Sequence, residues 1–349
     1  MTGIQDKDTK AVLGAEKGLC EEFTRVAYDQ TFAEVMRNPA RDGDDILKAA
    51  ACADMDIIFG EDHSVASETM RQIAELTGSL PEGHVKAIAL ESPVEMQELF
   101  DPATLQDISL QEFAYRSFVI DIEQIETLAG EMLEAGGINE AQHAYLMEHA
   151  ADQRRTLDET FAIPDIADRL QYTFPGQMYE MAKTALENGT PVIAADADRQ
   201  RQIGLILSDV IVPEDIRMSD AEFADLFHQG VDDLSDVDLL KDMGIDLDGP
   251  GVLLVHRGYA HINGKGWGEA AGTEQTNGID DILERSGREV LTIEIGPDYA
   301  AHSDVPDPAD ISLNVDGMGE AQLDRSAYQA SEGSGAAAPA DINALKPGG

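Results

Sequence analysis

The chain has 349 residues, of which 43% are hydrophobic and only 5% aromatic. This length and apolar content suffice for one large domain, or two, with a substantial core. The formal net charge of −44 would repel nucleic-acid phosphates and anionic lipid headgroups, so we expect neither nucleic acid nor a membrane as a partner. Such an excess of acidic residues is foremost a solubility device, of the kind expected in a salt-adapted organism.

The cysteine content and the N-terminal residues bear on the cellular compartment. Cys20 and Cys52 are too few for a disulfide framework in a chain of this length, which fits a reducing compartment. The N-terminal residues are charged where a signal peptide would need an apolar stretch, and no stretch reaches the length of a membrane-spanning helix. We therefore expect a cytoplasmic protein, with an oligomeric state that the sequence leaves open.

The first half of the chain predicts a βαβ unit behind a helical cap. Residues 1–50 carry apolar residues at mixed three- and four-residue steps, which predicts a helical N-terminal cap. A strand is expected at 55–59, followed by a helix that ends near Gly78, and a second strand at 85–90. A right-handed crossover sets the ends of both strands on the same edge of a parallel sheet.

The rest of the chain predicts a large helical insertion and three or four further strands. Residues 94–188 are helical in pattern, and we expect them to form a lid over the core. Strands are expected at 191–196, 251–256 and 289–295, with an edge strand at 311–315. The predicted fold class is thus α/β, with a central, mostly parallel sheet flanked by helices. Its core would consist of residues 51–93 and 189–320, and the Gly-, Ala- and Ser-rich stretch 330–349 predicts a disordered tail.

Ionisable residues follow the predicted strands at the places where each one ends. In an open parallel sheet, ligands bind just outside these carboxyl ends. The rule brings together Glu61 and His63 after the first strand, Glu91 after the second, Asp196 after the third and His261 after the fourth. Two carboxylates and two imidazoles can act as general acid and base, or can hold a divalent metal. The candidate catalytic residues are Glu61, His63, Glu91 and His261, and the candidate metal ligands are His63, Glu91 and His261.

A purely structural role is the alternative for each of these residues, because a strand-end histidine can cap a carbonyl and a glutamate can pair with an arginine. The two Gly-x-x-His frames at 60–63 and 258–261 are close to what chance gives for this composition, so the position past successive strands is the stronger signal. For His256, within the fourth strand, we expect an orienting or packing role. We expect Arg257 to be solvated and His149 to lie on the surface.

Three short runs resemble the Tiki/TraB/ChaN-like superfamily, which also includes erythromycin-esterase-like proteins. They are Phe59-Gly60-Glu61-Asp62-His63, Leu90-Glu91 and Gly258-Tyr259-Ala260-His261. The resemblance covers roughly residues 53–296 as an order of elements. It implies an α/β core with a helical lid and a site of Glu61, His63, Glu91 and His261. The activities of the superfamily range from metal-dependent proteolysis through haem-linked iron uptake to macrolide ester hydrolysis, so the resemblance does not choose a reaction.

Three functions follow as hypotheses. The first is a hydrolase in which Glu61 and His63 activate water, while His261 and Glu91 bind a divalent metal or orient a small-molecule or peptide substrate. The second is a binding protein for haem or another small anion in the same crevice. The third is an exported effector or partner-binding protein, with the helical insertion as its interaction surface.

Overall fold

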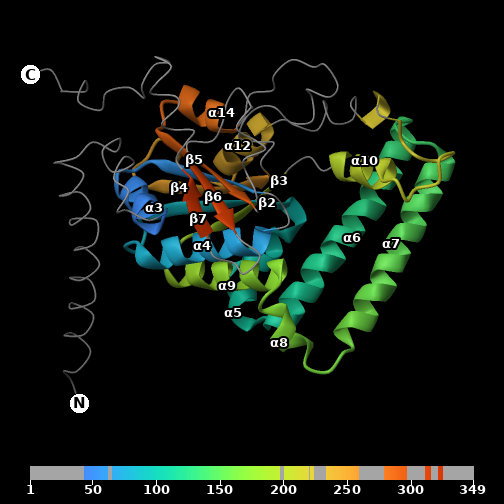
Figure 1. The fold of residues 1–349 in the computed structure, drawn as a ribbon, viewed down its shortest axis with the longest axis horizontal. Coiled ribbons are helices and arrows are strands. Elements are labelled where there is room, and N and C mark those ends of the chain that lie inside the picture. The colour runs from blue at the N-terminus through green and yellow to red at the C-terminus, as the bar shows by residue number, and fades with distance from the viewer. Residues whose placement is uncertain are drawn as a thin grey trace, which may run out of the picture.

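The computed structural model describes residues 43–61, 65–196, 200–219, 221–223, 233–258, 279–296, 311–315 and 321–324. These ranges form an α/β fold around one sheet in the order β3-β2-β4-β1-β5-β6-β7 (Figure 1). Every neighbouring pair is parallel except β6 and β7, which confirms the predicted mostly parallel sheet. The strands are β1 (Asp56–Glu61), β2 (Val85–Pro93), β3 (Val192–Asp196), β4 (Val252–Gly258), β5 (Val290–Gly296), β6 (Ile311–Val315) and β7 (Ala321–Asp324).

The central strands are buried along their whole length because helices cover both faces of the sheet. Every residue of β1 and β4 is buried, and successive side chains point to opposite faces. Ile57 and Phe59 belong to the apolar cluster on one face, and Ile58 belongs to the cluster on the other. The first face is covered by α3 (Gly43–Cys52), α4 (Ala66–Ser79) and α9 (Phe174–Glu187), and the second by α12 (Asp233–Asp242) and α14 (Ile279–Arg285) (Figure 1).

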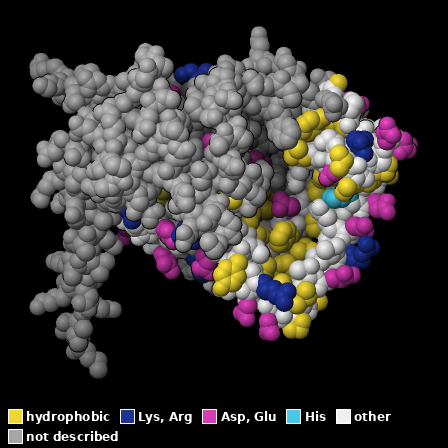
Figure 2. All heavy atoms as spheres, in the orientation of Figure 1, with side chains coloured by type: hydrophobic (Ala, Val, Ile, Leu, Met, Phe, Trp, Pro, Cys, Tyr) yellow, Lys and Arg dark blue, Asp and Glu magenta, His cyan; other side chains and the backbone are white. Residues whose placement is uncertain are grey.

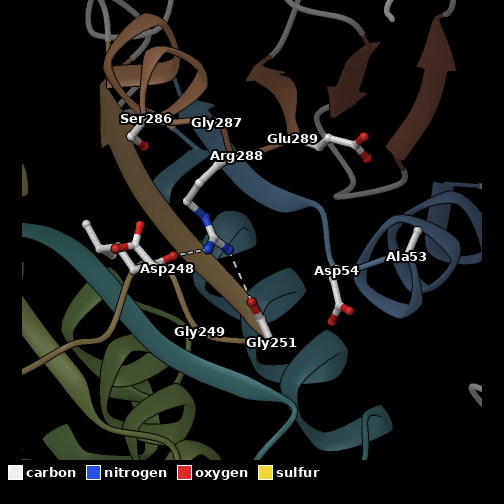
Figure 3. Close-up of a pocket in the computed structure, with 10 residues that line it drawn as sticks. Ala53, Asp54, Asp248, Gly249, Gly251, Ser286, Gly287, Arg288 and Glu289 are labelled. Atoms are coloured by element: carbon white, nitrogen blue, oxygen red, sulfur yellow. Dashed lines mark hydrogen bonds between the residues drawn. The ribbon is translucent and has the colours of Figure 1, made fainter. Parts of the chain in front are cut away.

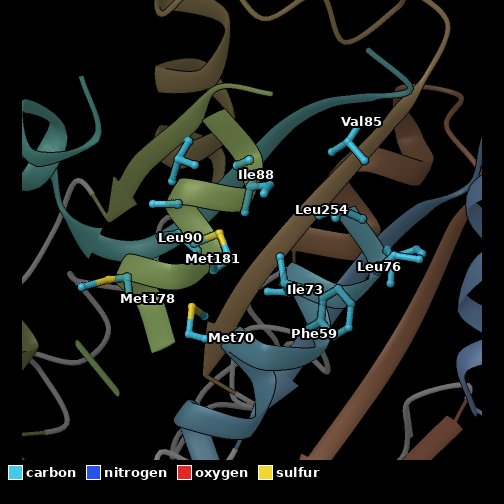
Figure 4. Close-up of a cluster of buried hydrophobic side chains, with 14 of the residues drawn as sticks. Phe59, Met70, Ile73, Leu76, Val85, Ile88, Leu90, Met178, Met181 and Leu254 are labelled. Carbon is cyan, nitrogen blue, oxygen red and sulfur yellow. The ribbon is translucent and has the colours of Figure 1, made fainter. Parts of the chain in front are cut away.

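The larger apolar cluster joins α4 and α9 to the sheet (Figure 4). Met70, Ile73 and Leu76 recur at three-residue spacing on α4, the interval that places side chains on one helical face, and each is at most 3% exposed. They pack against Phe59 of β1 and Leu254 of β4. Burying each such side chain stabilises the fold by about 1.5–3 kcal/mol. This packing holds the strands that carry the candidate site.

The helical insertion predicted at 94–188 is present between β2 and β3 (Figure 1). Its two long helices, α6 (Leu110–Ala135) and α7 (Glu140–Phe161), are joined by a short connection. Gly136 caps α6 in the left-handed conformation with φ of 76°, and Asn139 begins α7 in a capping box. A third apolar cluster binds this pair to α10 (Gln200–Ser208). The other elements of the insertion are η2 (Val94–Phe100), α5 (Pro102–Asp107), α8 (Ile166–Leu170) and α9, which packs on the sheet.

The start of α9 approaches the end of α8 so closely that only glycine fits. A methyl group at Gly176 would lie 1.8 Å from the carbonyl oxygen of Leu170. We expect Gly176→Ala to lower the free energy of unfolding by at least about 2 kcal/mol, because the backbone of one segment must shift. Urea unfolding measures this loss. The matched control is Gly130→Ala within α6, where a methyl group meets nothing within 4 Å and should stabilise the helix by about 0.5–1 kcal/mol.

Three features differ from the sequence-based expectations or lie beyond them. The second strand continues to Pro93, so Glu91 lies within it rather than after it, and β7 was not foreseen. Cys52 is disulfide-bonded, which contradicts the expectation of two reduced cysteines. The cytoplasmic location stays a prediction. Residues 1–42 of the expected cap and the expected tail at 330–349 lie outside the described ranges.

Candidate functional site

Two of the four predicted catalytic residues flank one glycine at the carboxyl edge of the sheet. Glu61 is the last residue of β1 and stands opposite Gly258 of β4 in the parallel register. On the other side of β4, the backbone N–H of Gly258 donates a hydrogen bond to Oε2 of Glu91. Glu61 continues the side-chain alternation of Ile57 and Phe59, and Glu91 continues that of Ala87 and Ala89, so the two carboxylates leave their strands toward opposite faces of the sheet at this edge. Glu61 is 2% exposed, whereas Glu91 is half-buried.

The carboxylate of Glu61 faces a histidine from the neighbouring strand. Nε2 of His256 lies 3.0 Å from Oε1 of Glu61, and the two side chains are 3% and 1% exposed. His256 stands opposite Phe59 in the register, so its side chain shares the sheet face of Phe59 and points toward α4 and α9. From α9, Phe174 stacks on the imidazole, with ring centroids 6.1 Å apart at 28°. The ring is therefore fixed on one side by a carboxylate and on the other by an aromatic plane.

The contact between His256 and Glu61 is close but poorly aligned for hydrogen bonding. Within the described part of the chain, neither Nδ1 nor Nε2 of His256 has a hydrogen-bond partner of good geometry. Leaving a buried polar atom in this state costs about 1–3 kcal/mol. Catalytic hydrogen bonds are often long or misaligned before a substrate is bound. The ring is thus buried close to a carboxylate, and neither of its nitrogens has a well-aligned hydrogen bond to a described residue.

Arg257 is buried on the opposite face of the sheet, which contradicts the expectation of a solvated side chain. It is 0% exposed, because it follows the buried Val255 by two residues and so points toward the α12 and α14 cluster. Its Nη2 donates to the carbonyl oxygen of Ala195 in β3 at 2.9 Å, and its Nη1 donates to that of His256 at 3.3 Å. Backbone carbonyls therefore replace the water that the guanidinium loses.

Two further carboxylates are buried at the same edge. Asp196 ends β3 at 6% exposure, and Glu294 in β5 is 3% exposed. Glu294 and Arg257 both stand opposite Gly60 in the register, from the two strands that flank β1. A buried cation at this position offsets part of the negative charge of the surrounding carboxylates. The edge is therefore a buried, charged cluster and not an apolar strand terminus.

The opposite, amino-terminal edge of the sheet carries a different polar network and a cavity of about 340 Å³. Arg288 points into this cavity and donates to the carbonyl oxygen of Gly251 (Figure 3). Its main partner is the carboxylate of Asp56, which is 0% exposed and also accepts a hydrogen bond from the backbone N–H of Leu253 at 2.8 Å. The hydrogen bond to Asp56 raises the pKa of Arg288 above its ordinary value. These contacts tie the starts of β1, β4 and β5 together, which is a structural role.

The described residues by themselves do not form a metal site. Among them, no group of three or more His, Cys, Asp and Glu side chains is arranged to hold a metal ion. Of the proposed ligands, Glu91 already accepts the Gly258 N–H, and His63 and His261 lie outside the described ranges. We assign no chemical step to a metal.

Sequence reasoning located Glu61 and Glu91 correctly at one edge, but it gave too little weight to three other residues. His256 was expected only to orient or pack, Arg257 was expected in solvent, and Glu294 was not singled out. The signal for Glu294 was present in the sequence: a glutamate stands between Ile293 and Ile295 in an alternating strand. That pattern predicts that the glutamate points to the face of the sheet opposite the two isoleucines, but it does not show that helices cover this face.

Comparisons with known proteins identify no relative. No family model, curated protein or solved structure matches the chain. No helix in the described ranges combines the length and apolar character needed to cross a membrane.

Proposed function

We propose that the chain is a hydrolase whose active site is the carboxyl edge of the sheet around Glu61, His256 and Glu91. The observation that supports this most is the buried contact of 3.0 Å between Glu61 and His256, in which the imidazole nitrogens lack hydrogen-bond partners among the described residues. Polar atoms left in this state in a folded protein call for an explanation such as a catalytic role. The contact also lies where open parallel sheets bind ligands.

In the proposed reaction, water attacks the carbonyl carbon of an ester or amide in a small-molecule or peptide substrate. Glu61 accepts a proton from the attacking water and later returns it to the leaving group. His256 holds this carboxylate in position and shares the proton, because its Nε2 lies 3.0 Å from Oε1. Glu91, the less buried of the two glutamates, orients the substrate. In this proposal His63 activates the water together with Glu61, and His261 orients the substrate together with Glu91.

Membership in the Tiki/TraB/ChaN-like superfamily, with the helical insertion as a lid, is part of this proposal. Support comes from two features: Glu61 and Glu91 both lie at the carboxyl edge, and a helical insertion separates β2 from β3. A cytoplasmic location is also part of the proposal.

The experiment that tests the proposed function is a hydrolysis assay of the full chain. Its substrates are p-nitrophenyl esters of increasing acyl length, p-nitroanilide peptides and unlabelled casein. We expect turnover of at least one ester or amide, and we expect this turnover to be lost when the carboxylate of Glu61 is removed. Hydrolysis that continues unchanged without that carboxylate would refute the proposed site.

A divalent metal held by His63, Glu91 and His261 is a separate proposal with its own measurement. Elemental analysis of the purified full chain should find about one equivalent of a divalent metal, reduced in His63→Ala and in His261→Ala. The control is His84→Ala. Nε2 of His84 lies 2.7 Å from the carbonyl oxygen of Ala51, a residue that precedes the first strand. If the wild-type protein carries no metal above the buffer background, these three residues are not metal ligands.

A further inference from the structure

The helical insertion and α10 enclose a cleft of about 720 Å³ that none of the roles above uses. This volume is in the range of small-molecule sites. The view in Figure 2 shows hydrophobic side chains gathered in a hollow on this part of the surface. The apolar lining comes from α6, α7, α8 and α10, and includes Phe118, Ile122, Ile125, Leu157, Leu170 and Ile206.

One arginine at this cleft differs from the arginines of the two long helices. Arg169 lines the cleft and is exposed, yet it forms no salt bridge with any described residue. In contrast, Arg116, Arg154 and Arg155 on α6 and α7 each pair with a carboxylate. A cation without a carboxylate is unexpected in a chain with 68 acidic and 24 basic residues. It supplies a positive charge at a largely apolar cleft.

A residue with a buried, unpartnered acceptor also lines this cleft. Oε1 of Gln202 is buried and has no hydrogen-bond partner within the described residues, although the side chain lines the cleft from α10. An amide oxygen in this position requires an N–H or O–H donor. Of the two carboxylates in the lining, Asp152 is neutralised by Arg155 at 2.8 Å, and Asp121 interacts with another residue. The imidazole of His149 also lines the cleft, and its Nε2 lies 2.8 Å from Nε2 of Gln153. Arg169 is therefore the basic side chain of the lining that has no partner among the described residues.

From these three features we infer that the cleft binds a small anionic amphiphile. Its apolar body would lie against the isoleucine and leucine side chains of α6, α7 and α10. Its carboxylate or sulfonate would meet Arg169, and an N–H or O–H group would donate to Gln202. This binding site is independent of the proposed hydrolysis at the carboxyl edge.

The test uses 8-anilinonaphthalene-1-sulfonate, a fluorescent probe with an apolar body, one sulfonate and one N–H donor. N-phenyl-1-naphthylamine is its uncharged counterpart, with the same rings and N–H. We expect saturable binding of the sulfonate to the full chain, weakened roughly threefold to tenfold in Arg169→Gln, with less than about a twofold change for the uncharged probe. Arg116→Gln is the matched control, because Arg116 of α6 pairs with Glu98 and neither residue lines the cleft.

A second variant keeps the inference testable if fluorescence arises elsewhere on the chain. Thr156 is exposed on α7 and lines the cleft, so Thr156→Trp should fill it without disturbing the core and weaken both probes at least roughly tenfold. Glu61→Gln should leave binding of both unchanged. Fluorescence that persists in Thr156→Trp would place the probe outside the cleft and overturn the inference. Equal binding of the sulfonate to wild type and Arg169→Gln would overturn the recognition of an anion.

Discussion

Glu61→Gln is expected to reduce hydrolysis by at least about 100-fold, which is the lower range for removal of a general base. The amide has the shape of the carboxylate but cannot accept the proton of the attacking water at neutral pH. Its oxygen can still face Nε2 of His256, so the contact that now spans 3.0 Å keeps an acceptor. The midpoint of urea unfolding should therefore move little. Steady-state kinetics on the best substrate of the panel measures the loss in kcat.

Two controls separate catalysis from folding in this experiment. Glu98→Gln removes a carboxylate that is 73% exposed and pairs only with Arg116 among the described residues, and it should leave both kcat and stability unchanged. His256→Asn should lower kcat less than Glu61→Gln, because it removes the group that positions the carboxylate and not the carboxylate itself. If Glu61→Gln and His256→Asn both unfold the protein at room temperature, the pair is structural and the proposed site is wrong.

Asp56→Ala is expected to cost about 3–5 kcal/mol of the free energy of unfolding, the range for removing one partner of a buried ion pair. Asp56 is 0% exposed, and its partner Arg288 has a side chain only 10% exposed. The alanine variant would leave the guanidinium buried beside the sheet without its carboxylate. It would also leave the backbone N–H of Leu253 without the acceptor it now has at 2.8 Å. Urea unfolding followed by circular dichroism measures this change.

The double variant Asp56→Ala/Arg288→Met distinguishes a stranded charge from lost packing. Because the arginine is then absent as well, the double variant should be more stable than Asp56→Ala alone. Asp248→Ala is the matched control: Asp248 lines the same cavity but is exposed, and its loss should change stability by less than about 0.5 kcal/mol. A cost below about 1 kcal/mol for Asp56→Ala would show that the buried pair contributes little to holding the three strands together.

The sequence predicted the α/β class and the order of most elements because these depend on local patterns. The runs at 55–59, 85–90 and 251–256 are apolar almost throughout, which indicates strands buried on both faces. Glycine and proline marked several of their ends. Strand boundaries were less certain, and β2 extends three residues beyond the predicted limit to include Glu91. A glutamate is polar enough to indicate a strand end in the sequence, but here the N–H of Gly258 accommodates its carboxylate.

The location of the candidate site also followed from the sequence, because the βαβ rule alone puts Glu61 and Glu91 on one edge. Which polar residues are buried there was decided by strand order and register. His256 faces Glu61 only because β4 lies beside β1, although about 195 residues separate them in the chain. Arg257, one residue later, points to the other face and donates to a carbonyl of β3. Pairing between distant strands leaves no local signal, so this part of the site required the tertiary structure.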